Sequence, residues 1–207
     1  MVEAGDDIIF IGISEDMSVT CNTLRLAAEE LSYNKLRVIN SKNLSTGIGL
    51  QVLRAAEYAK EGKDPDWIVE QINAARDKVK ASFVIDTLTY LHRGGRCSAV
   101  TALLGNVLKL KPMIAVQDGK MGVAKKYRGK QNAVVRSYAK ELEEQLLNAD
   151  PTRVFITHSG IDKEIEQETY EYIKSLNYFK EILITRAGGV ISSHCGPNTL
   201  GILYYEK

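Results

Sequence analysis

Apolar residues in the first third of the chain occur either in short β-branched runs or at helical spacing. The run at residues 7–13 (DIIFIGI) predicts a buried parallel strand, and residues 35–39 predict a second strand. Apolar positions repeat as on one face of a helix at residues 20–31 and again at 46–60. The order strand, loop, helix, strand, loop, helix is typical of a parallel α/β sheet.

The pattern changes near residue 80. A third helix is predicted from Pro65, which suits the first turn of a helix, to about Lys80. Beyond it, short apolar runs that predict strands alternate with helical segments. The predicted strands lie at 83–85, 113–116, 154–157, 182–185 and 201–205, and the predicted helices near 97–108, 131–148 and 162–176. We therefore expect two α/β domains, residues 1–80 and residues 81–207.

Composition excludes several classes of function. The chain has 27 basic and 26 acidic residues, and this balance argues against a nucleic-acid-binding protein. No apolar run is long enough to span a bilayer, and no signal-peptide pattern follows Met1. Three widely spaced cysteines without a CxxC pair make a disulfide framework or a zinc site unexpected. We expect a cytoplasmic protein with no bound metal.

Hydroxyl groups gather where the first predicted strand gives way to a helix. Ser18 and Thr20 lie at this junction, where hydroxyls and free backbone N–H groups form an anion site. The alternative is that one of them only caps the helix. Gly47-Ile48-Gly49, after the second strand, lacks the third glycine of a dinucleotide fingerprint, so we expect no cofactor there.

The sequence has three histidines, His92, His158 and His194. His194 lies in the segment ISSHCGP, which we expect to be a loop between a glycine pair and a turn. We do not expect Cys195 to be a nucleophile with His194 as its base, because neighbours in an extended chain point to opposite sides. His92 and His158 follow apolar segments without metal-ligand spacing, and we interpret both as structural or solvent-facing.

Two basic segments allow more than one interpretation. Arg93-Gly94-Gly95-Arg96 is predicted to be a turn, in which the glycines permit positive φ and the guanidinium groups project beside the backbone. The alternative is a helix-to-helix turn with solvated arginines. A second basic cluster follows the predicted hairpin turn Asp118-Gly119, and it is either a solvated surface or a docking surface for an acidic partner. The cluster consists of Lys125, Lys126, Arg128 and Lys130.

Three of these segments together resemble the DegV family of bacterial lipid-binding proteins. The first is the stretch from Phe83 to Gly119, which contains the RGGR turn, a Lys-Pro pair and the Asp-Gly turn. The second is Asn40-Ser41-Lys42 followed by Gly47-Ile48-Gly49, and the third is residues 193–197. The resemblance extends over nearly the whole chain.

The resemblance implies a two-domain α/β protein that binds one long-chain fatty acid between its domains without catalysis. It implies that Ser18 and His194 meet the carboxylate, and Thr20 matches the threonine of the same family motif. It also implies a partner, a fatty-acid kinase that uses ATP, and we expect Arg93 and Arg96 to contribute to docking. Two alternatives remain open: an acyl-transferring hydrolase using Ser18 and His194, although no G-x-S-x-G elbow is present, and a protein-interaction module.

The sequence departs from the family pattern at four places, one of which is Cys21-Asn22 in place of Tyr-Gln. Val19 stands where the family has glycine beside the serine, and Asn198 replaces the last glycine of the histidine motif. A family segment with an Asp-Ser and a Thr-Ser motif, which precedes the first strand, is not found in this sequence. We therefore expect either that the chain is a fragment or that the first domain is incomplete, with an exposed edge of its parallel sheet.

Overall fold

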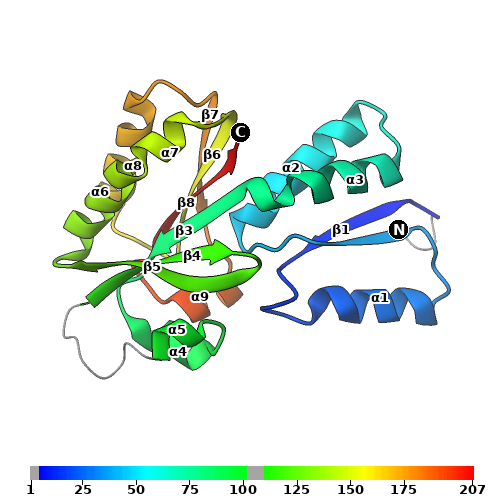
Figure 1. Cartoon of the computed structure of the whole chain (residues 1–207), viewed down its shortest axis with the longest axis horizontal. Coiled ribbons are helices and arrows are strands. Elements are labelled where there is room, and N and C mark those ends of the chain that lie inside the picture. The colour runs from blue at the N-terminus through cyan, green and yellow to red at the C-terminus, as the bar shows by residue number, and fades with distance from the viewer. Residues whose placement is uncertain (1–4, 102–109) are drawn as a thin grey trace. The chain divides into compact units, whose positions relative to one another are not determined.

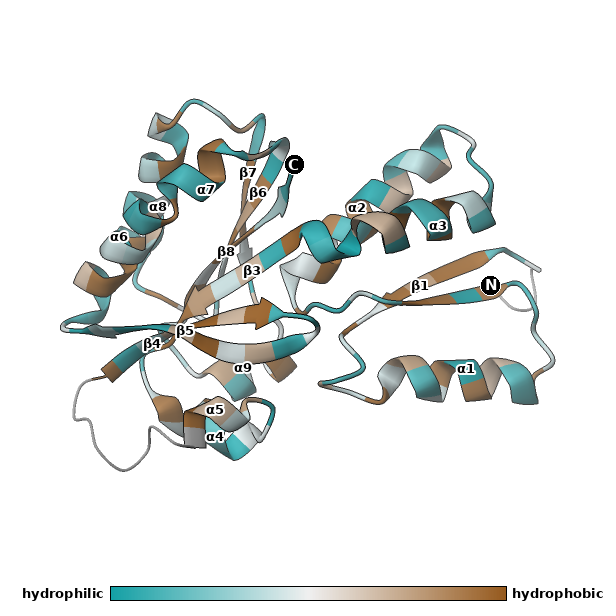
Figure 2. Ribbon diagram, in the orientation of Figure 1, coloured by the Kyte–Doolittle hydropathy of each residue, from teal (hydrophilic) through white to brown (hydrophobic). Residues whose placement is uncertain are grey.

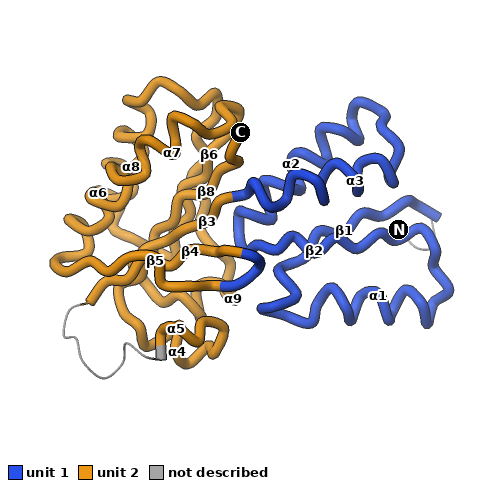
Figure 3. The backbone as a smooth tube through the Cα atoms, viewed as in Figure 1, with its two compact units in different colours: residues 1–79, 118–120 blue, residues 80–117, 121–207 orange. Residues whose placement is uncertain are grey.

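The computed structural model describes residues 5–101 and 110–207, which form two compact α/β units (Figures 1 and 3). Unit 1 consists of Met1–Val79 and Asp118–Lys120, and unit 2 of Lys80–Gln117 and Met121–Lys207. The predicted α/β class is confirmed. Within the described residues, none of the helices combines the length and the apolar character that a membrane span requires.

Unit 1 is built on two parallel strands. β1 (Ile8–Gly12) pairs with β2 (Leu36–Asn40), and α1 (Thr20–Glu30) connects them. α2 (Thr46–Lys60) and α3 (Pro65–Ala75) follow, on the side of the strands opposite to α1 (Figure 1). The parallel strand–helix–strand beginning and the bounds predicted for α2 are confirmed.

The core of unit 1 lies between the two strands and the layer formed by α2 and α3. It contains Ile11 and Ile39 from the strands, Ala55 from α2 and Ile68 and Ile72 from α3. Figure 2 shows β1 as a predominantly hydrophobic strand. A strand that is apolar on successive residues needs cover on both faces, and the two helical layers provide it.

The predicted end of the third helix is wrong. α3 begins as predicted, with Pro65 in its first turn and the Asp64 side chain accepting hydrogen bonds from Asp66 N and Trp67 N. It ends at Ala75, however, and a short 3-10 turn, η1 (Arg76–Lys78), separates it from the next strand. Val79 opens that strand and is buried there, as are Ala81, Ser82, Phe83 and Val84 further along it.

Unit 2 contains a six-stranded mixed sheet with the order β5-β4-β3-β8-β6-β7. β3 is antiparallel to β4, and β6 is parallel to β7 and antiparallel to β8. The strands are β3 (Val79–Val84), β4 (Leu110–Gln117), β5 (Lys120–Arg128), β6 (Ala149–His158), β7 (Glu181–Arg186) and β8 (Leu200–Glu206). β5 was not predicted: the basic cluster at residues 125–130 lies largely on this edge strand, where lysines discourage pairing with other chains.

Helices cover one face of this sheet and one of its ends. α6 (Gln131–Glu141), α7 (Glu143–Leu147) and α8 (Lys163–Ser175) lie on the face, and their apolar residues form the main core with the strands (Figure 1). α4 (Leu88–Gly94), α5 (Ser98–Thr101) and α9 (Gly189–Cys195) lie at the end of the sheet. Of the helix predicted near residues 97–108, only α5 (Ser98–Thr101) falls within the described residues, and residues 102–109 lie outside them.

A buried tyrosine joins the two central strands of the sheet. The hydroxyl of Tyr138, on α6, accepts a hydrogen bond from Ile202 N (3.0 Å) and donates one to Ser82 O (2.8 Å). Tyr138 is fully buried, and this burial raises its pKa, so the hydroxyl keeps its proton. A side chain thus supplies bonds to backbone groups of β3 and β8.

Candidate functional site

In unit 1, the loop after β1 presents two hydroxyl groups at the start of α1. Met17 N and Ser18 N both donate hydrogen bonds to Ser14 O, at 2.9 and 3.1 Å, which closes a turn. The side chain of Met17 is buried. Ser18 Oγ lies 2.8 Å from Thr20 Oγ1 and accepts the N–H of Thr20 at 3.3 Å. Because one hydroxyl donates to the other, the second O–H is left to donate to a ligand.

The helix does not use either hydroxyl residue as its N-cap. Val19 occupies that position, and no side chain caps it. Its φ is −83°, an ordinary value, and its side chain is 74% exposed. The valine that replaces the family's glycine therefore causes no backbone strain next to Ser18.

Close packing at the end of β1 fixes the first turn of α1. Cys21 is fully buried, with Sγ 3.6 Å from Ile13 O and 3.8 Å from Ile39 O. A Cβ at Gly12 would overlap the Cys21 sulfur, so only glycine lets the helix approach this closely. Burial raises the pKa of the Cys21 thiol, which keeps it neutral.

The predicted hairpin turn is present and is anchored by a serine that the sequence did not single out. Asp118 and Gly119 join β4 to β5 with φ of +50° and +81°, as the common two-residue hairpin turn requires. Ser14, which is fully buried, donates from Oγ to Gly119 O at 2.6 Å. All three residues belong to unit 1.

In unit 2, the RGGR and HCGP segments pack directly against each other. His194 lies in the last turn of α9 and not in a loop, so that prediction is wrong. A Cβ on Gly94 would lie 2.5 Å from His194 Nδ1, and a Cβ on Gly196 would lie 2.9 Å from Tyr90 Cγ. Gly94 thus accepts the ring of His194 and Gly196 the ring of Tyr90 on α4, which places His194, half-buried, against the end of α4.

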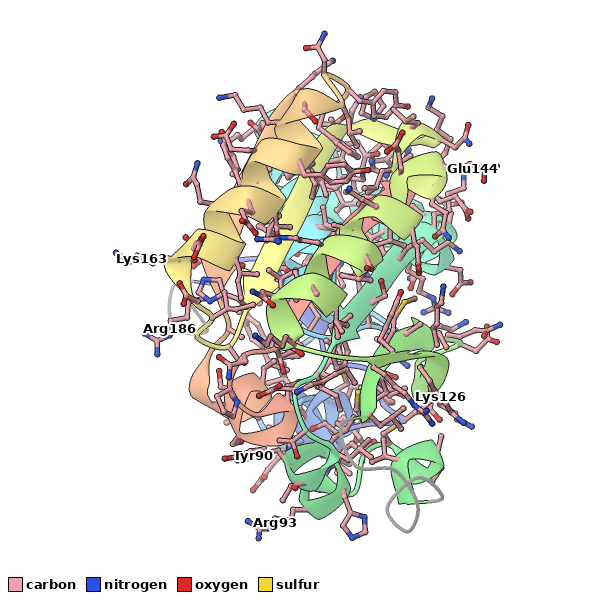
Figure 4. All side chains as sticks on the ribbon, turned by 90° about the vertical axis from the view of Figure 1, so that its left-hand side faces the viewer. Tyr90, Arg93, Lys126, Glu144, Lys163 and Arg186 are labelled. Atoms are coloured by element: carbon pink, nitrogen blue, oxygen red, sulfur yellow. The ribbon has the colours of Figure 1, made fainter. Side chains whose placement is uncertain are left out.

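The RGGR segment ends a helix instead of forming a separate turn, because α4 continues through Arg93 and Gly94. Gly95 has φ of +65° and its N–H bonds to His92 O (3.0 Å), which is the common left-handed C-cap. Arg96 donates from Nη1 to Gly94 O at 2.8 Å and so satisfies a terminal carbonyl. Arg93 is exposed and projects outward from α4 (Figure 4).

Cys195 is unsuited to nucleophilic chemistry for a reason other than the one expected. Cys195 and His194 are neighbours on a helix, not on an extended strand. Cys195 is only 5% exposed, and burial raises the pKa of its thiol to about 12. The reactive thiolate is therefore suppressed at neutral pH.

The end of the HCGP segment is held by polar contacts. Asn198 has φ of +59°, a left-handed conformation that asparagine tolerates. Its Nδ2 donates to Asp86 Oδ2 at 3.2 Å, and Lys111 pairs with the same carboxylate. Replacement of the family's glycine by Asn198 therefore keeps the backbone geometry and adds a hydrogen bond.

The other histidines differ in their surroundings. His92 is exposed on α4, whereas His158 lies 2.9 Å from a carboxylate oxygen of Glu166. Among residues 5–101 and 110–207, no group of three or more His, Cys, Asp or Glu side chains could hold a metal ion.

The glycine at the end of α4 gives a stability prediction. We expect Gly95→Val to lower the free energy of unfolding by about 1–3 kcal/mol, because a β-branched residue is strained at φ of +65°. Gly122→Val is the matched control, since a Cβ there has nothing within 4 Å. Urea denaturation compares the two variants, and equal, small losses would contradict the assigned conformation.

Comparisons with known proteins agree over the whole chain. The model of the DegV family of uncharacterised proteins matches residues 1–207. A DegV domain-containing protein of Clostridium perfringens is 32% identical over 98% of this chain and 71% of its own length. A fatty-acid-binding DegV family protein from Thermus thermophilus has a TM-score of 0.88 at 28% identity, over 100% of this chain and 73% of that one. DegV of Bacillus subtilis, a fatty-acid-binding protein, has a TM-score of 0.80 at 28% identity. The match covers 99% of this chain and 73% of the Bacillus chain.

Proposed function

Because the chain belongs to the DegV family, we propose that it binds one long-chain fatty acid and does not transform it. The observation that carries the proposal is its likeness, along the whole chain, to structures of fatty-acid-binding DegV proteins at 28% identity. The hydroxyl pair in unit 1 and the histidine in unit 2 are groups suited to a carboxylate.

We propose that Ser18, Thr20 and His194 are the carboxylate ligands. One O–H of the Ser18–Thr20 pair is available to donate, and the first turn of α1 adds backbone N–H groups that favour an anion. The ring N–H of His194 would supply a further hydrogen-bond donor. A carboxylate that leaves bulk water needs several such donors, because an underpaired charge in an apolar site is costly.

The hydrolase alternative has less support. Ser18 Oγ is engaged with Thr20, and a serine nucleophile needs a base that accepts its proton. Within the described residues, no carboxylate forms a hydrogen bond to His194, whereas a catalytic histidine is normally oriented by one. We therefore propose binding alone, and keep hydrolysis as an outcome of the test below.

Mass spectrometry tests the proposed function most simply. The protein is purified, extracted with organic solvent, and the extract analysed for free fatty acids and for acyl esters. A stoichiometric fatty acid supports the proposal. Conversion of an added acyl ester to free acid would favour the hydrolase, and an extract without lipid, from protein that also fails to bind added fatty acid, would favour the interaction module.

We further propose that a fatty-acid kinase docks at Arg93 and Arg96. Replacing Arg96 by alanine is expected to leave the fold intact, because the exposed side chain makes one local bond, to Gly94 O. Transfer of phosphate from ATP to the bound fatty acid by a bacterial fatty-acid kinase should fall several-fold. Lys163→Ala, at the exposed start of α8 (Figure 4), is the control. An unfolded Arg96→Ala protein would instead make the arginine structural.

A further inference from the structure

The two ends of α9 are tied to one short loop that follows β6. Residues His158–Gly160, called the brace loop below, comprise the last residue of β6 and the two residues after it. Ahead of α9, Ala187 N donates to His158 O at 2.8 Å. The chain therefore enters the helix that carries His194 from a fixed point on the brace loop.

The chain that leaves α9 is held by the same loop. Asn198 N donates to Gly160 O at 3.0 Å, and Ser159 N donates to Thr199 O at 3.0 Å. Ser159 Oγ also donates to Gly196 O, directly after the helix. A seven-residue helix is too short to be stable by itself, and α9 lacks a side-chain N-cap, so its position depends on these outside contacts.

The ring of His158 contacts both the brace loop and α8. Its Nδ1 accepts the N–H of Gly160 at 3.2 Å, which closes a turn around Gly160 at φ of +88°. Its Nε2 lies 2.9 Å from Glu166 Oε2 on α8. Because Nδ1 accepts a hydrogen bond, it carries no hydrogen of its own. Nε2 is therefore the nitrogen that donates a hydrogen bond to Glu166. The His158 side chain is only 11% exposed, and both of its nitrogens have partners within the protein.

We infer that His158 is a positioning residue for His194, acting through the brace loop and oriented by Glu166. The inference rests on the proposed function, in which His194 contacts the fatty-acid carboxylate. Glu166 fixes the ring, the ring fixes the turn at Gly160, and the turn holds both ends of α9. Packing against Gly94 then limits the His194 ring from the side of α4.

Two substitutions separate positioning from a general loss of stability. His158→Ala removes the acceptor for Gly160 N–H, whereas His158→Asn places an oxygen at the same distance along the side chain and can close the same turn. Ile173→Val, in the core beside the same sheet, is the control for a modest loss of stability without a change in the loop. Each variant is titrated with cis-parinaric acid, a fluorescent long-chain fatty acid.

We expect His158→Ala to weaken binding by about tenfold, the size of one lost ligand hydrogen bond. His158→Asn should remain within about threefold of the wild type, and Ile173→Val should bind as the wild type does. Equal affinity of the wild type and His158→Ala would overturn the inference. So would a His158→Asn protein as weak as His158→Ala.

A spectroscopic measurement needs no ligand and separates the inference from the proposed function. The chain has three histidines, so the ring signals of His194 can be assigned by NMR with His92→Gln and His158→Asn. His158→Ala should shift the His194 ring signals, and Ile173→Val should not. A wild type that fails to bind cis-parinaric acid would refute the proposed function alone. His194 signals that stay unchanged in His158→Ala would refute the positioning role alone.

Discussion

Fatty-acid binding is expected to weaken by about ten- to a hundredfold when His194 is replaced by phenylalanine, because a hydrogen bond to a charged group contributes about 1.5–3 kcal/mol. Phenylalanine keeps an aromatic ring against Gly94, where the histidine ring lies, but has no N–H to donate. The fold of unit 2 should therefore be retained. Fluorescence titration with cis-parinaric acid measures the effect.

The control for this variant is His92→Phe. His92 is the exposed histidine of α4, and it shares the residue type and the neighbourhood of the site but is assigned no ligand. Its replacement should leave the dissociation constant unchanged. Equal affinities of His194→Phe and the wild type, with both proteins folded, would remove His194 from the proposed site.

Tyr138→Phe is expected to reduce the free energy of unfolding of unit 2 by about 2–4 kcal/mol. The substitution leaves Ile202 N and Ser82 O without the hydroxyl that bonds both, and each buried unpaired group costs about 1–3 kcal/mol. The ring itself still fills its place in the core. Tyr172→Phe is the matched control, because its hydroxyl bonds to Glu143 near the surface.

Urea denaturation of both tyrosine variants decides the point. The control should lose at most about 1 kcal/mol, the usual net value of one hydrogen bond that water can replace. If Tyr138→Phe were no less stable than Tyr172→Phe, the two central strands would not depend on the tyrosine bridge.

The sequence predicted those elements whose apolar pattern is long and regular. The parallel pair β1 and β2 and the bounds of α2 follow from β-branched runs and from helical spacing. α4 and α9 were missed, because seven residues make only two turns and leave too little periodicity to detect. For the same reason His194 was expected in a loop.

The candidate site could be predicted in its residue types but not in its packing. Hydroxyls at a strand-to-helix junction indicated Ser18 and Thr20, and these two are in hydrogen-bond contact. The fit of His194 against Gly94 joins segments far apart in the sequence, and no local pattern predicts it. Ser14 was missed, and His158 was interpreted only as structural or solvent-facing, because their contacts are with the distant partners Gly119 and Glu166.

The central claim, that Ser18 and His194 bind the same fatty-acid carboxylate, is tested most directly by a double-mutant cycle. Dissociation constants for cis-parinaric acid are measured for the wild type, Ser18→Ala, His194→Phe and the double variant. Two residues that share one partner should give losses that differ from additivity by about 0.5–3 kcal/mol. Losses that add to within about 0.5 kcal/mol would show two independent effects and would contradict a shared carboxylate.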